Sequence, residues 1–172
     1  MFVWDFLFIL ILVALNAFFT SVEFASVAAR RARIELLADE GNPAAMIVKG
    51  WLENPSSRSR LIAACQLGIT IVSLALGAVG ENTFQKLLAP TFNRIALPAN
   101  LQHLTSLLAA LPLILSLIII TSIHVVLGEQ VPKVATLHQP ERIAMLGAQP
   151  MKLFTTVFKW FIDILDWAPN SC

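Results

Sequence analysis

The segment 128–133, GEQVPK, brings a glycine, a carboxylate and a proline together at the end of a long apolar run. In a continuing α-helix the N–H of residue 132 would bond the carbonyl of residue 128. Pro132 has no N–H, so the Gly128 carbonyl lacks that partner and lies beside the Glu129 carboxylate. A hard cation would satisfy both oxygens where lipid cannot. The segment therefore predicts a cation site. The alternatives are that glycine and proline only end a helix, and that Glu129 reaches the membrane surface.

Two other apolar segments carry oxygen-bearing side chains that recur at steps of three and four residues, which places them on one helix face. On the second segment they are Gln66, Thr70 and Ser73. On the first segment they are Asn16, Thr20 and Glu23, with Ser21 about 100° round the helix. Hydroxyl, amide and carboxylate oxygens suit Mg²⁺ or Ca²⁺, and also Na⁺. The alternative is that these residues only mediate helix packing in the membrane.

The elements that must position these groups are three apolar stretches, at about 4–29, 61–80 and 104–127. Each is long enough to cross a bilayer as a helix, which takes about 20 residues. The chain of 172 residues is 57% hydrophobic and only 13% charged, with a mean hydropathy of +0.75. The sequence therefore predicts an all-α membrane protein with three transmembrane helices. The alternative for any one stretch is a buried helix of a soluble protein.

The orientation follows from the Lys and Arg residues in the connections between spans. The first connection holds Arg30, Arg31, Arg33, Lys49, Arg58 and Arg60. The second holds Lys86 and Arg94, and the third span is followed by Lys133, Arg142, Lys152 and Lys159. We therefore expect the N-terminus outside the cell and the C-terminus in the cytoplasm. Helical spacing also predicts a cytoplasmic helical hairpin over 31–55 and an amphipathic juxtamembrane belt over 140–167.

Several function classes find no support in the sequence. The net charge of +1 gives no reason to expect a nucleic-acid partner. We find no Cys/His cluster for zinc, no glycine-rich phosphate loop and no hydrolase triad, so we expect no enzymatic activity. His124 lies five residues before Glu129 and is either a packed, hydrogen-bonded histidine or a member of a proton relay.

Three strings of the sequence resemble the transmembrane domain of the CorC / cyclin M (CNNM) family. They are LNAFFTSVEFASVAARRARIELLA, AACQLGITIVSLALGAVGE and HVVLGEQVPKVATL. The resemblance covers nearly the whole chain, which we interpret as a single transmembrane domain over 1–172. The paired CBS module and the small C-terminal domain typical of the family are not in this sequence.

The resemblance implies a magnesium transporter of the cell (inner) membrane, with Na⁺-dependent Mg²⁺ export as the favoured activity and Na⁺ as the coupling ion. It also implies a homodimer that holds a dehydrated Mg²⁺ in each protomer. By the same resemblance the metal ligands are Glu129, Gly128, Ser73, Thr20 and Ser21, with Asn16 and Thr70 in reserve. The competing hypothesis is a non-transporting module that senses Mg²⁺ or anchors other domains, and a third is a cation channel.

Overall fold

The computed structural model describes residues 2–92 and 105–167, all of which are helical or lie in short connections between helices. Two residues used in the predictions lie outside the described residues. They are Arg94, a basic residue of the second connection, and Leu104, the predicted first residue of the third span. The elements are α1 (Phe2–Ala28), α2 (Arg31–Asp39), α3 (Pro43–Glu53), α4 (Pro55–Phe92), α5 (Thr105–Ile123), the π-helix η2 (His124–Gln130), α6 (Val131–His138), α7 (Pro140–Val157) and α8 (Lys159–Trp167).

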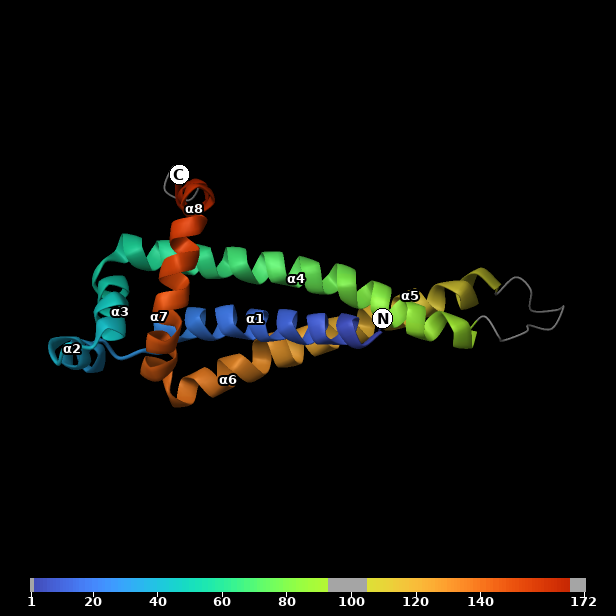
Figure 1. Ribbon diagram of the computed structural model, residues 1–172, viewed down its shortest axis with the longest axis horizontal. Helices are drawn as coiled ribbons and strands as arrows, with labels where there is room; N and C mark the ends of the chain where they lie inside the picture. The colour runs from blue at the N-terminus through green and yellow to red at the C-terminus, as the bar shows by residue number, and fades with distance from the viewer. Residues whose placement is uncertain (1, 93–104, 168–172) are drawn as a thin grey trace.

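Within residues 2–92 and 105–167, three helical rods are long and apolar enough to cross a membrane: Val3–Ala28, Pro55–Phe92 and Leu107–His138. They lie side by side, and α1 and the third rod both run antiparallel to α4 (Figure 1). The chain is therefore an all-α, multi-pass membrane protein, as predicted. The N-terminus of α1 lies at the opposite end of the bundle from α2, α3 and α7, which is the arrangement that three crossings require.

The second rod extends beyond the predicted span 61–80 at both ends, and a cap and a proline account for its early start. The side-chain oxygen of Asn54 accepts two hydrogen bonds from Ser56, one from its backbone N–H at 3.0 Å and one from its side-chain hydroxyl at 2.7 Å. Pro55 occupies the first helical position, where its missing N–H costs little. The helix then continues past the apolar part as far as Phe92.

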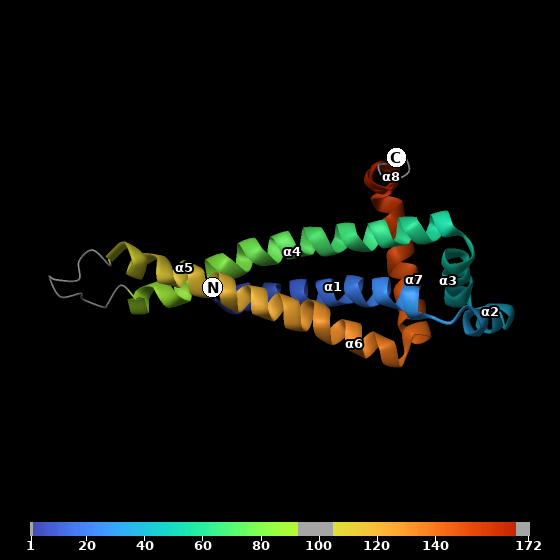
Figure 2. The ribbon, with the colours of Figure 1, turned by 180° about the vertical axis from the view of Figure 1, so that it is seen from behind.

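The third rod does not end at the GEQVPK segment. Residues 124–130 form a π-helix, and the N–H of Val131 bonds the carbonyl of Val126, five residues earlier. The wider π-helical turn accommodates the missing N–H of Pro132. Helix α6 therefore follows directly, and Pro132 lies in its first turn. Seen from behind, α5 and α6 form one continuous rod that passes α1 and α4 (Figure 2). A π-helix is rare and is often found at functional sites.

Glycines allow the helices to approach closely. A Cβ added at Gly68 of α4 would lie 2.6 Å from the ring of Phe19 on α1, and one at Gly80 would overlap Ile120 on α5. Gly147 of α7 meets Val22 of α1 in the same way. Small residues at contacts between transmembrane helices permit this dense packing. The contacts of Gly68 and Gly147 hold α1 against α4 and α7, and the contact of Gly80 brings α4 close to α5.

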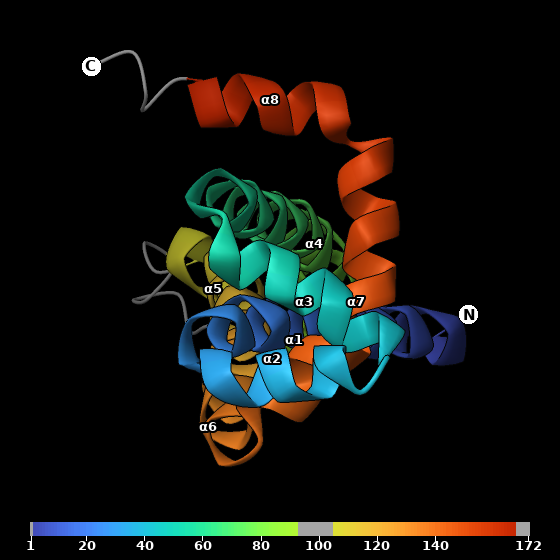
Figure 3. The same cartoon turned by 90° about the vertical axis from the view of Figure 1, so that its left-hand side faces the viewer.

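The helices outside the spans gather at one end of the bundle (Figure 3). Asn42 caps α3 by accepting hydrogen bonds from the N–H groups of Ala44 (3.0 Å) and Ala45 (3.1 Å). Residues 140–167 form two helices, because the backbone leaves helical geometry at Phe158 (φ −95°, ψ 18°). Helix α7 runs across the ends of α1 and α4, and α8 turns away from it (Figure 3). That these helices form a cytoplasmic belt stays a prediction.

Candidate cation site

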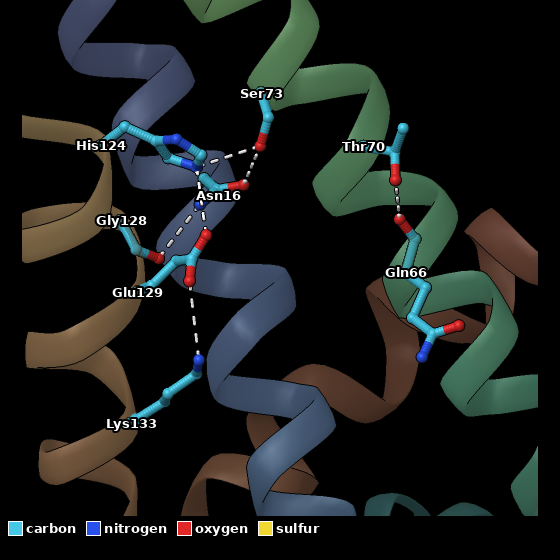
Figure 4. A network of polar contacts seen from close by, with 8 residues as sticks. All are labelled: Asn16, Gln66, Thr70, Ser73, His124, Gly128, Glu129 and Lys133. Carbon is cyan, nitrogen blue, oxygen red and sulfur yellow. Dashed lines mark hydrogen bonds and ion pairs between the residues drawn. The ribbon is translucent and has the colours of Figure 1, made fainter. Parts of the chain in front are cut away.

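Asn16 of α1 joins all three spans through its side-chain amide (Figure 4). The residue is fully buried. Its amide nitrogen donates to the carbonyl of Gly128 on η2 at 3.2 Å, and its oxygen accepts from the hydroxyl of Ser73 on α4 at 3.3 Å. The Gly128 carbonyl is therefore not unpaired, contrary to the expectation drawn from Pro132. The proline does remove a backbone donor, but a side chain from α1 supplies another.

His124 and Glu129 extend this network along η2. The Ser73 hydroxyl lies 3.0 Å from Nε2 of His124, and the same nitrogen lies 3.5 Å from one carboxylate oxygen of Glu129. Ser73 has a single hydroxyl proton and can donate to only one of Asn16 and His124, so the donor in the shorter contact is set by the tautomer of His124. The other carboxylate oxygen of Glu129 lies 3.6 Å from the ammonium of Lys133 (Figure 4).

A cavity of about 410 Å³ opens beside this network, lined by Thr20, Glu23, Gln66, Ile69, Thr70, Glu129 and Lys133. Thr20 is almost fully buried, and its hydroxyl has no hydrogen-bond partner among the described residues. The Thr70 hydroxyl donates to the carbonyl of Gln66 at 2.8 Å, so its lone pairs remain able to accept or to ligate. The cavity thus combines two carboxylates and neutral oxygens with one ammonium, a set that can bind a cation if the ammonium withdraws.

The structure divides the predicted ligands into three groups. Gly128 and Ser73 lie in the hydrogen-bonded network with Asn16, whereas Glu129, Thr20 and Thr70 line the cavity. Ser21 lines a different and mainly apolar cavity of about 390 Å³, together with Leu127, Pro132 and Gly147. The step of about 100° between consecutive helical residues separates Ser21 from Thr20. The ligand roles of all these residues stay predictions.

No group of three or more His, Cys, Asp or Glu side chains that could hold a metal ion occurs within residues 2–92 and 105–167. A cation in the cavity would therefore need hydroxyl, amide or carbonyl oxygens beside the carboxylates of Glu23 and Glu129. Such a mixed oxygen set favours the hard cations Mg²⁺, Ca²⁺ or Na⁺ over zinc or copper.

The family model for the cyclin M transmembrane N-terminal domain (CNNM) matches residues 7–172. The chain belongs to the cyclin M family. Among curated relatives, it is 39% identical over 156 residues to UPF0053 protein YhdP of Bacillus subtilis, covering 91% of this chain and 33% of the relative. It is 38% identical to UPF0053 protein YhdT of the same organism, covering 91% and 32%. The chain thus spans about a third of the length of these relatives.

A shorter match joins this cyclin M domain to the polyamine export protein of Escherichia coli. The two are 38% identical over 76 residues, which is 44% of this chain and 16% of the relative.

Sequence reasoning missed the part that Lys133 plays in this cyclin M domain. We used Lys133 only as a charge that orients the chain, but its ammonium faces Glu129 and lines the cavity. The available signal was the spacing of four residues between them, which brings the two side chains together on a helix. Asn16, a reserve candidate, proves to be the residue that connects the three spans.

Proposed function

We propose that this cyclin M domain transports Mg²⁺ through the cavity beside Glu129, and that it exports Mg²⁺ in exchange for Na⁺. The observation that supports the proposal most is the Thr20 hydroxyl, which is buried without a partner and lines the same cavity as two carboxylates. A buried unpaired hydroxyl costs about 1–3 kcal/mol. A bound cation would remove that cost, whereas a role in helix packing would not.

The size of the cavity suggests how loading would proceed. Mg²⁺ gives up its water ligands reluctantly and demands octahedral geometry. Six waters occupy roughly 180 Å³ in the liquid, and the cavity offers about 410 Å³. The ion would therefore enter with its water shell, and exchange for protein oxygens would follow as the helices close around it. Entry would also require the ammonium of Lys133 to leave the Glu129 carboxylate.

Two substitutions test the proposal in proteoliposomes loaded with Mg²⁺. Glu129→Gln removes the carboxylate charge and is expected to abolish Mg²⁺ binding and flux. Thr20→Val removes only the unpaired hydroxyl, so it is expected to leave the metal-free protein as stable as before, or more so, while Mg²⁺ binding weakens.

The matched control is Thr83→Val on α4. Thr83 is also buried, but its hydroxyl already donates to the carbonyl of Val79 at 2.8 Å. Mg²⁺ binding should be unchanged in this variant. If Glu129→Gln still exports Mg²⁺ at the rate of the unmodified protein, the assignment of the site is wrong.

A second candidate substrate is an organic polycation. Two features favour it: the match to a protein named for polyamine export, and two carboxylates, Glu23 and Glu129, that line one cavity. A diamine would use both carboxylates and would need no closed oxygen shell. Flux of putrescine and of Mg²⁺ into the same liposomes separates the two substrates.

The remaining alternative is a module that senses Mg²⁺ or anchors other domains without transporting anything. It shares the binding site but predicts no flux of any cation from liposomes containing the purified protein. Measured binding with no flux would therefore favour it over a transporter, and currents far above carrier rates would favour a channel.

We also propose that the chain forms a homodimer in the cell membrane, with its N-terminus outside and its C-terminus in the cytoplasm. In one protomer Gln66 and Thr70 are exposed, and Glu129 is 29% exposed, on spans that lipid would otherwise surround. Polar groups at this depth usually face protein or water, so a second protomer is a suitable cover. Crosslinking in native membranes tests the dimer, and labelling of single cysteines placed in the connections tests the orientation.

A further inference from the structure

A second polar cavity, of about 620 Å³, lies at the end of the bundle that α2, α3 and α7 occupy. Its walls come from the end of α1, from α2, from the end of α6 and from the start of α7. The charged residues that line it are Arg30, Arg33, Glu141 and Arg142, and His138 adds an imidazole. It is separate from the cavity beside Glu129, with which it shares no lining residue.

One of the three arginines, Arg30, already forms an ion pair within the protein. Nε of Arg30 donates to the Glu141 carboxylate at 3.0 Å, and the backbone N–H of Arg30 donates to the same oxygen at 3.4 Å. Glu141 is buried, with a side chain that is only 7% exposed. This pair joins the end of α1 to the start of α7 and holds the wall of the cavity in place.

The other two guanidinium groups have no carboxylate partner. Among the described residues, no Asp or Glu oxygen lies within 4.0 Å of Arg33 or Arg142, and Arg142 donates only to the side-chain oxygen of Gln139 at 3.3 Å. The carboxylate of Glu141 balances Arg30, so the residues that line the cavity leave two positive charges uncompensated. Two guanidinium groups that line one cavity are well suited to a phosphate group, which they bind through several N–H donors at once.

The surroundings of the cavity indicate where that phosphate would come from. Leu137 lines the cavity and is 59% exposed, and Val134, one turn earlier on α6, is equally exposed. Both belong to the third rod, which is long and apolar enough to cross a membrane, so their exposed side chains are available to an acyl chain. An apolar strip thus leads along α6 directly to the basic cavity.

We propose that this cavity binds the phosphate of an anionic phospholipid headgroup, while an acyl chain lies against α6. Basic pockets at the ends of transmembrane helices are a recognised means of selecting such lipids. The lipid would bridge α2 and α7, two helices joined here chiefly through α3, and would anchor the end of the third span at the membrane surface. The proposal is independent of the substrate of the other cavity.

The test compares lipids on the purified chain by titration in native mass spectrometry. Phosphatidylglycerol is expected to bind at least about tenfold more tightly than phosphatidylcholine. The double variant Arg33→Gln/Arg142→Gln should lose most of that preference, and each single variant should lose about threefold. The control Arg58→Gln/Lys152→Gln removes two basic groups outside the cavity and should keep the full preference.

Soluble phosphates identify the source of the ligand. Inorganic phosphate and glycerol 3-phosphate at millimolar concentration should displace little phosphatidylglycerol, because neither contacts the apolar strip. Displacement by either at the affinity of the lipid would overturn the lipid assignment. Equal losses in the cavity variant and the control variant, or no preference for phosphatidylglycerol in the unmodified chain, would overturn the site itself. The single variants keep the test decisive if the double variant does not fold.

Discussion

Substitution of Gly128 by alanine tests whether the link between Asn16 and η2 holds the spans together. An added Cβ would lie 2.8 Å from the amide nitrogen of Asn16 and 3.2 Å from Cδ2 of His124. Ordinary contact begins at 3.4 Å, so the amide must withdraw by about 0.6 Å. Its hydrogen bond to the Gly128 carbonyl is already 3.2 Å long, so this displacement would break it. The buried carbonyl would then lack a partner, which costs about 1–3 kcal/mol.

Gly77→Ala on α4 is the matched control, because an added Cβ there has no atom within 4 Å. Both substitutions gain the helix propensity of alanine, about 1 kcal/mol, so this contribution cancels in the comparison. The variant at 128 should therefore be less stable than the variant at 77 by about 1–3 kcal/mol. Reversible unfolding in mixed detergent micelles, followed by circular dichroism, measures the difference.

A double-mutant cycle isolates the contact itself. With Asn16→Ala already present, the amide that the new methyl group displaces is absent, and the difference between positions 128 and 77 should approach zero. If alanine at 128 is as stable as alanine at 77, or if Asn16→Ala leaves the difference unchanged, then the amide does not hold η2 and the account of the network is wrong.

Two further substitutions probe charged residues near the C-terminal end of the third span, Lys133 on α6 and Glu141 on α7. Lys133→Gln removes the ammonium that faces Glu129 and would repel an incoming Mg²⁺, so Mg²⁺ should bind at least about tenfold more tightly in calorimetric titrations; unchanged or weaker binding would contradict the proposed displacement. Burial by itself would raise the pKa of Glu141, but hydrogen bonds from the Arg30 side chain and from backbone N–H groups lower it below its ordinary value of 4.5. A lowered pKa stabilises the fold above pH 4.5, and this contribution is lost as the pH falls through the lowered value. Glu141→Gln should therefore be less stable than the unmodified chain at neutral pH, and the gap should narrow as unfolding is measured at increasingly acid pH. A gap that stays constant would show that the Arg30 pair does not depend on the Glu141 charge.

The sequence by itself determined the number of spans, the helical class and the family. These follow from local properties: apolar stretches of sufficient length and motifs that occupy neighbouring positions. The same local logic placed Gln66, Thr70 and Ser73 on one helix face and indicated that Pro132 would disturb the backbone near Gly128. The sequence could not decide whether the missing N–H of Pro132 ends the helix. A π-helix accommodates the missing N–H, and this π-helix depends on the helices that pack against it.

Only the tertiary structure decided which polar groups meet. Asn16 and Gly128 are 112 residues apart in the chain, and the amide of Asn16 supplies the hydrogen bond that Pro132 removes. Thr20 and Ser21 are neighbours in sequence, yet helix rotation and the position of α4 place them in separate cavities. Side-chain spacing fixes which groups share a face of one helix, whereas the rotation and separation of packed helices fix which faces oppose each other, and these depend on contacts such as that between Gly80 and Ile120.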